Sequence, residues 1–97
     1  MRLKKEYIDF IKKTTKDCFG NNAKVYLFGS RVDDKKRGGD IDLYIETNIK
    51  ENILDRKLKM LVELEKILGE QKIDLIVNTF HTEKPIYAVA KQEGIRL

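Results

Sequence analysis

The stretch "YLFGSRVDDKKRGGDIDLYIE", residues 26–46, joins a short apolar run to an alternating run through a loop rich in Gly, Lys and Arg. The apolar run, "AKVYLF" when read from Ala23, has the length and composition of a strand with both faces covered. The run "DIDLYIE" alternates, so its isoleucines and leucine share one face while Asp40 and Asp42 share the other. The stretch therefore predicts two strands, of which the second is half-buried and carries two carboxylates on one face.

Two helices are predicted on either side of this stretch. Apolar residues at helical spacing over residues 2–19 predict an amphipathic helix that ends at Gly20. After the second strand, Asn48 followed by Glu51 has the pattern of a capping box, and Gly69 has the pattern of a helix stop. The wide apolar face predicted for this second helix includes Ile53, Leu54, Leu58, Leu61, Leu64 and Leu68.

The last quarter of the chain predicts one more strand and one more helix. The run "KIDLIVN", residues 72–78, alternates and has Asp74 in the middle of an otherwise apolar sequence. Thr82 can cap a final helix with a proline in its first turn and Gly94 as its stop. This order of elements predicts one α/β (α+β) domain over residues 1–97, with a small mixed sheet of about three strands and helices packed on one face.

Composition and charge exclude several classes of protein. The 97 residues are 41% hydrophobic and 37% charged, which is typical of a soluble globular domain. The net charge of +4 is concentrated in the first helix, where a solvated lysine-rich face is favoured over a site for an anionic partner, and no direct nucleic-acid contact is expected. No long apolar run or signal-like segment occurs, which predicts a cytoplasmic protein without a membrane partner. Cys18 is the only cysteine, so an internal disulfide is excluded and a buried packing role is predicted.

The aspartates predict a site for divalent cations. Asp40 and Asp42 lie two residues apart on one strand, so their Cα atoms are roughly 6.5 to 7 Å apart and their side chains can reach one point. A lone Asp74 in an apolar strand needs compensation, which a neighbouring strand could supply by bringing it beside the pair. Clustered carboxylates repel one another and recruit cations, and ligands that offer only oxygen suit Mg²⁺ or Mn²⁺.

The turn after the first strand predicts a phosphate site. Gly29 allows a close approach of the backbone, and the Ser30 hydroxyl can donate to an anion. Arg31 adds a positive charge at the same place. A Gly-Ser turn alone is a common connector, and an Asp-x-Asp pair alone can be a solvated strand face. Their joint occurrence with Asp74 favours a functional site for nucleotide chemistry.

The combined pattern resembles the nucleotidyltransferase superfamily of DNA polymerase beta. Within it the sequence looks most like the minimal nucleotidyltransferases, the MNT antitoxins that are paired with HEPN toxins. The resemblance covers nearly the whole chain and rests on "FGSRVDDKKRGGDIDLYI", on "KIDLIV" and on the ending "PIYAVAKQEGIRL". Nine residues separate Ser30 from Asp40, one fewer than in the usual minimal pattern, and a loop that contains glycine can absorb that difference.

The resemblance implies an activity and a set of roles. Asp40 and Asp42 would hold two Mg²⁺ ions, with Mn²⁺ as a possible substitute, and Asp74 would be the third carboxylate ligand. Gly29 and Ser30 would contact the triphosphate of ATP, and Arg31 is also assigned to phosphate. The family implies transfer of AMP from ATP to a tyrosine hydroxyl of a cognate HEPN RNase toxin, which neutralises the toxin within a complex of the two proteins.

Two other functions remain open from the sequence. An antitoxin could mask its partner simply by binding, without catalysis, or the enzyme could transfer a nucleotide to a small molecule or to RNA.

Two further residues have alternative roles: Tyr44 could stack on a base, although packing across strands is favoured, and His81 is expected at the surface or near a helix cap.

Overall fold

The structure is a computed structural model, and it describes residues 4–28, 41–69, 72–79, 87, 90, 92 and 94–97. Along the chain, α1 (Lys5–Phe19) precedes β1 (Lys24–Phe28) and β2 (Ile41–Glu46). They are followed by α2 (Ile53–Leu68), β3 (Ile73–Asn78) and the short β4 (Ile95–Arg96). Each of the first five elements was predicted, whereas β4 had no signal in the sequence because two residues are too few to alternate.

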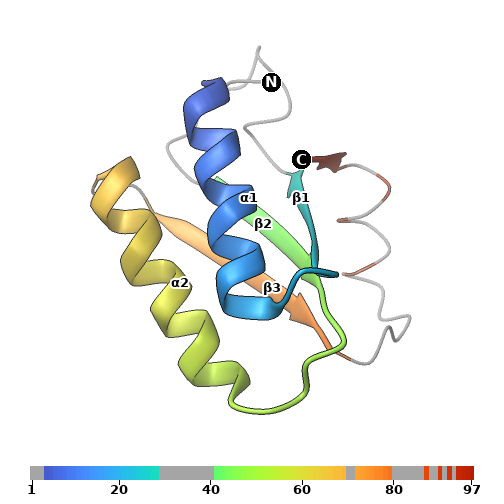
Figure 1. Cartoon of the computed structure of the whole chain (residues 1–97). Coiled ribbons are helices and arrows are strands. Elements are labelled where there is room, and N and C mark those ends of the chain that lie inside the picture. The colour runs from blue at the N-terminus through green and yellow to red at the C-terminus, as the bar shows by residue number, and fades with distance from the viewer. Residues whose placement is uncertain are drawn as a thin grey trace.

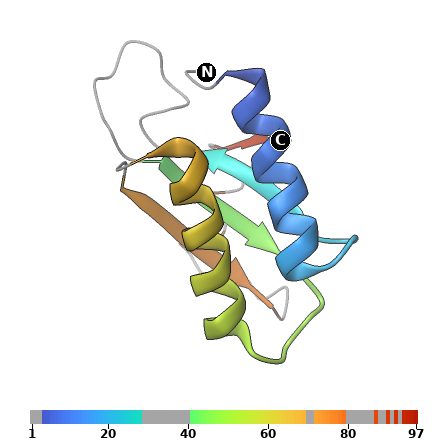
Figure 2. The same cartoon turned by 60° about the vertical axis from the view of Figure 1, so that its left-hand side comes forward.

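The strands form one mixed sheet in the order β3-β2-β1-β4. Strand β1 pairs antiparallel with β2 and β4, whereas β2 pairs parallel with β3 across the crossover through α2. Figures 1 and 2 show α1 and α2 side by side on one face of this sheet, as predicted for these two helices, whereas the helical residues Tyr87 and Ala90 pack on the opposite face. The mixed α+β architecture is therefore as predicted, with a fourth strand added at the edge.

The main core lies between that helical layer and the sheet. Alternate residues of β1 and β2 point into it, because side chains along a strand alternate between faces. The buried core residues are Ile11, Cys18, Phe19, Val25, Leu27, Ile41, Leu43, Ile45, Met60, Leu64, Leu68 and Leu75. A smaller cluster lies on the opposite face, where Tyr87 and Ala90 pack against Tyr26 and Tyr44. Tyr87 and Ala90 are helical, and most of the predicted final helix lies outside the described residues.

Helix α1 ends as predicted, at Gly20, whose φ of 95° is a conformation that suits glycine. Its last carbonyl groups are bound by side chains from the segment around the start of α2. The Thr47 hydroxyl donates to the Phe19 carbonyl at 2.6 Å, and Arg56 Nη1 donates to the Cys18 carbonyl at 2.9 Å. These bonds satisfy acceptors that a helix end leaves unpaired and fix α1 against α2.

Helix α2 begins later than the capping-box pattern predicts. The N-cap is Asn52, with a left-handed φ of 56° and no side-chain cap bond, so the prediction of a cap at Asn48 was wrong. The reason lies in Thr47, whose hydroxyl accepts the Ile49 N–H at 3.1 Å while it donates to α1. The chain at Ile49 is thereby held as a connector, and the helix starts only at Ile53.

Candidate active site

The structure places Asp42 and Asp74 side by side. Asp42 lies on β2 and is half-buried, and Asp74 lies on β3 and is exposed. They are direct partners in the parallel register, so their Cα atoms belong to neighbouring strands about 4.8 Å apart and their side chains share a face. The expectation that a neighbouring strand brings Asp74 beside the first carboxylates is confirmed for Asp42. Asp40, Gly29, Ser30 and Arg31 lie outside the described residues.

A cavity of about 520 Å³ contains both carboxylates. It lies around β3, because residues from both faces of that strand line it, and it also receives two side chains from α2. Its lining residues are Phe28, Asp42, Lys57, Leu61, Ile73, Asp74, Leu75 and Ile76. Lys57 and Leu61 were not predicted here, since helical spacing alone does not show which side of a helix reaches past the edge of a sheet.

The pair of carboxylates fits a divalent cation. At about 4 Å, two negative charges repel by about 4 kcal/mol at an effective dielectric near 20, so a bound cation relieves an unfavourable contact. Asp74 makes no side-chain hydrogen bond or ion pair within the described part of the chain, so its oxygens are available. The described residues contain no cluster of three or more metal-ligating side chains, and the third predicted ligand, Asp40, falls outside them.

The other end of the same face holds a buried polar network. The Tyr44 hydroxyl donates to Glu46 Oε2 at 3.0 Å and accepts from Asn78 Nδ2 at 3.1 Å. Tyr44 is 1% exposed, and its ring centroid is 5.7 Å from those of Tyr26 and Tyr87. Burial, more than its hydrogen bonds, raises the pKa of Tyr44 to about 12. The predicted packing of Tyr44 across strands is confirmed, and the ring is closed to a nucleotide base.

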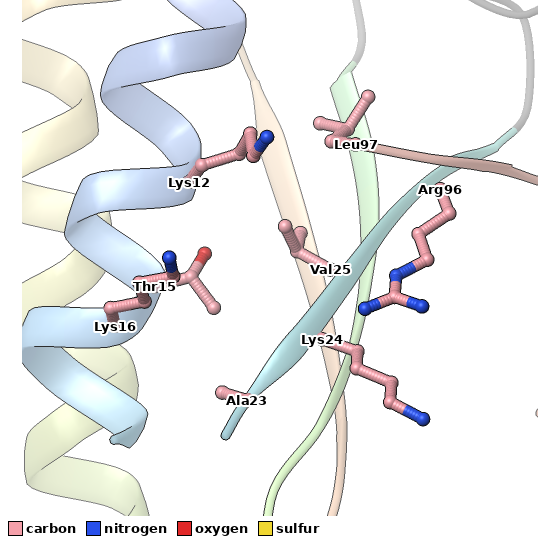
Figure 3. A pocket seen from close by; sticks show the side chains of 8 residues that line it. All are labelled: Lys12, Thr15, Lys16, Ala23, Lys24, Val25, Arg96 and Leu97. Carbon is pink, nitrogen blue, oxygen red and sulfur yellow. The ribbon is translucent and has the colours of Figure 1, made fainter. Parts of the chain in front are cut away.

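A second, basic pocket of about 190 Å³ lies at the opposite end of β1, between α1 and β4. Figure 3 shows Lys12 and Lys16 projecting from α1, and Lys24 and Arg96 projecting from the strands. Their four charged ends are exposed and point in different directions rather than toward one point. This arrangement agrees with the prediction of a solvated lysine-rich face.

Cys18 is a packing residue. It is 3% exposed in the main core, and burial raises the pKa of its thiol, which keeps the sulfur protonated. The predicted packing role is therefore confirmed. His81 lies outside the described residues, so its predicted place near a helix cap stays a prediction.

A family model described as "Polymerase beta, Nucleotidyltransferase" matches residues 9–97. The chain belongs to this family of nucleotidyltransferases, and the match spans the cavity with Asp42 and Asp74. A search of curated proteins found no match. In the described part of the chain, neither helix combines the length and the apolar composition that a membrane crossing requires.

Proposed function

We propose that the protein transfers AMP from ATP to a tyrosine hydroxyl of a HEPN-domain partner and thereby neutralises that partner as an antitoxin. The observation that carries the proposal is the pair Asp42 and Asp74, held in register on neighbouring strands and open to one cavity. The membership of residues 9–97 in the nucleotidyltransferase family supports the reaction class. The resemblance of the sequence to minimal nucleotidyltransferases supports the choice of acceptor.

In this proposal the carboxylates hold the cations, and the turn after β1 holds the triphosphate. Asp42 and Asp74, together with Asp40, would bind Mg²⁺, which when bound offsets the charge of the triphosphate and lowers the pKa of the attacking hydroxyl. Gly29 and Ser30 would donate to phosphate oxygens, and Arg31 would add a positive charge.

The transfer itself is a displacement at the α-phosphorus of ATP. The acceptor oxygen forms a bond to that phosphorus, the bond to the bridging oxygen breaks, and pyrophosphate leaves. The proton of the hydroxyl passes to Asp74, which is exposed and so can accept it from an incoming group. The product is a tyrosine that carries AMP as a phosphodiester.

The experiment combines the protein with Mg²⁺, ATP labelled at the α-phosphate, and a HEPN-domain protein offered as the acceptor. The wild type is expected to label the partner and to stop its RNase activity, and Asp42→Asn with Asp74→Asn is expected to do neither. Labelling that survives the double substitution would overturn the proposed site. A wild type that blocks the RNase without labelling it would establish masking instead, and label on RNA or a small molecule would establish a different acceptor.

A further inference from the structure

Strand β3 carries one apolar side chain on the face that holds the carboxylates. Side chains alternate along a strand, so Asp74, Ile76 and Asn78 share that face, and Asn78 is buried in the network with Tyr44. Ile76 is half-buried and lines the same cavity as Asp42 and Asp74. Because residues two apart on a strand have Cα atoms roughly 6.5 to 7 Å apart, Ile76 offers an apolar surface directly beside Asp74.

Packing from behind holds Ile76 in place. It is the register partner of Tyr44, and it packs against the cluster that Tyr26, Tyr44 and Ala90 form on that face. The cluster covers part of Ile76, and the cavity borders another part. A side chain that is already ordered loses little further freedom when a ligand contacts it, so Ile76 is prepared for binding.

The proposed reaction fixes the side from which the acceptor approaches. In a displacement at phosphorus, the attacking and leaving oxygens lie roughly in line on opposite sides. The triphosphate is assigned to Gly29 and Ser30, which directly follow Phe28 in the sequence. Asp42 has Phe28 as its register partner on β1 and Asp74 as its register partner on β3. Pyrophosphate therefore leaves toward β1, and the attacking hydroxyl approaches over β3.

The surroundings of Asp74 indicate what kind of hydroxyl can lie there. A tyrosine carries its hydroxyl on a rigid apolar ring, so a hydroxyl at Asp74 extends the ring along the strand. Two residues before Asp74 is Lys72, which is exposed and does not line the cavity, and two residues after it is Ile76, which does. The backbone of a serine or the sugar of a ribose would instead place polar groups on Ile76, where they lose hydrogen bonds to water.

We propose that Ile76 contacts the aromatic ring of the accepting tyrosine and thereby selects a phenol hydroxyl over an aliphatic one. This inference rests on the proposed function and adds to it the residue that chooses the acceptor. Strand β3, orange in Figure 2, is the outermost strand of the described sheet on its side, so the ring enters the cavity over that strand. Contact with Ile76 orients the ring while its hydroxyl lies at Asp74.

The kinetic test is the substitution Ile76→Thr, which keeps the branched shape at Cβ and removes apolar surface. With Mg²⁺, labelled ATP and a HEPN-domain protein as the acceptor, the KM for the acceptor is expected to rise about fivefold to tenfold, because apolar contact is lost. The KM for ATP is expected to stay within about twofold, a difference too small to indicate a lost contact. Circular dichroism checks that the variant is folded.

Two further variants separate this contact from a general loss of packing. Val77→Thr makes a similar change at the next residue, which is also half-buried but packs against the main core on the opposite face. It is expected to lower stability and to leave the KM for the acceptor unchanged. Ile76→Val keeps an apolar surface at the contact, so it is expected to retain the KM of the wild type within about twofold.

A second measurement needs no transfer. Protein labelled at its isoleucine methyl groups is followed by nuclear magnetic resonance with Mg²⁺ and an ATP analogue that cannot be cleaved after the α-phosphate. N-acetyltyrosinamide is expected to move the Ile76 methyl proton signal upfield, because a ring stacked on a methyl group shields it. The methyl signal of Ile45, which is buried in the main core, is expected not to move. N-acetylserinamide is expected to leave both signals in place.

Several outcomes would overturn the inference. An unchanged KM for the acceptor in Ile76→Thr, with transfer by the wild type, would remove Ile76 from the acceptor site and leave the proposed function standing. A rise in the KM for ATP alone would place the nucleotide base on Ile76 instead. If the wild type transfers nothing, the proposed function fails, and the resonance measurement then decides: an upfield shift of Ile76 supports the ring contact, and its absence contradicts it.

Discussion

The sheet face that lies away from α1 and α2 is open at one end and sealed at the other. At the open end Asp42 and Asp74 border a cavity of about 520 Å³. At the sealed end Glu46 and Asn78 are 7% and 3% exposed, and both are bonded to the hydroxyl of Tyr44. The two ends use the same strands and the same face, and both contain acidic side chains.

The difference shows that position along a strand decides what an acidic residue does. Glu46 is buried and accepts the Tyr44 hydroxyl, and the same hydroxyl accepts from Asn78, so this network joins β2 to β3. Asp74 is exposed and has no side-chain partner among the described residues, so it contributes little to stability and is available to a ligand. Substitutions at the two ends should therefore affect different measurements.

The largest expected effect comes from the open end. Asp74→Asn removes one carboxylate from the proposed cation site, and a loss of several kcal/mol in transition-state stabilisation lowers transfer by about a thousandfold. The melting temperature is expected to stay within about 2 °C, because the substitution is exposed and nearly isosteric. Label transfer and thermal unfolding are measured on the same preparation. The first measurement checks the predicted loss of transfer, and the second checks that the melting temperature is unchanged. A variant that melts much earlier would show that Asp74 is structural.

The next effect comes from the sealed end. Tyr44→Phe keeps the ring packing but removes the hydroxyl that joins Glu46 to Asn78, and it is expected to lower the free energy of unfolding by about 1 to 3 kcal/mol. Transfer below the unfolding transition should stay within a factor of about three, since the ring does not line the cavity. Urea unfolding and the labelling assay test this. A thousandfold loss of transfer in Tyr44→Phe would show that the sealed end also takes part in the reaction, which contradicts its structural role.

A smaller effect is expected at alkaline pH. Tyr44 has a pKa of about 12 in the folded protein, above its ordinary 10.0, so the folded state holds the proton that the unfolded state releases. This stabilisation is present below about pH 10 and is lost as pH rises from about 10 to about 12. Urea unfolding at pH 9 and pH 11 should show the stability difference between wild type and Tyr44→Phe becoming smaller. A difference that is the same at both pH values would contradict the burial of a neutral hydroxyl.

Much of the fold could be predicted because periodicity and stops are local. The alternation in β2 and β3 and the glycines that end α1 and α2 were visible in the sequence. The start of α2 was not, because the side chain of Thr47 holds the connector against α1 through a tertiary contact. The exposure of Leu54 was also not visible, since an apolar stripe does not show whether it faces a core or a partner.

The candidate site was predictable in composition but not in arrangement. The spacing of the aspartates indicated cation chemistry, yet only strand pairing places Asp74 opposite Asp42. The same alternation put Glu46 on the aspartate face, and nothing in the sequence distinguished its structural role from theirs. That distinction depends on Tyr87 and Ala90, which cover the sealed end from a distant part of the chain.

Binding of Mn²⁺ tests most directly the claim that the open end is the cation site and the sealed end is structural. The signal of free Mn²⁺ in electron paramagnetic resonance is followed while ATP and the protein are present, for the wild type, for Asp42→Asn with Asp74→Asn, and for Glu46→Gln. The account predicts protein-dependent binding that the double substitution abolishes and that Glu46→Gln leaves unchanged. Equal binding by the wild type and the double variant, or a loss caused by Glu46→Gln in a folded protein, would contradict it.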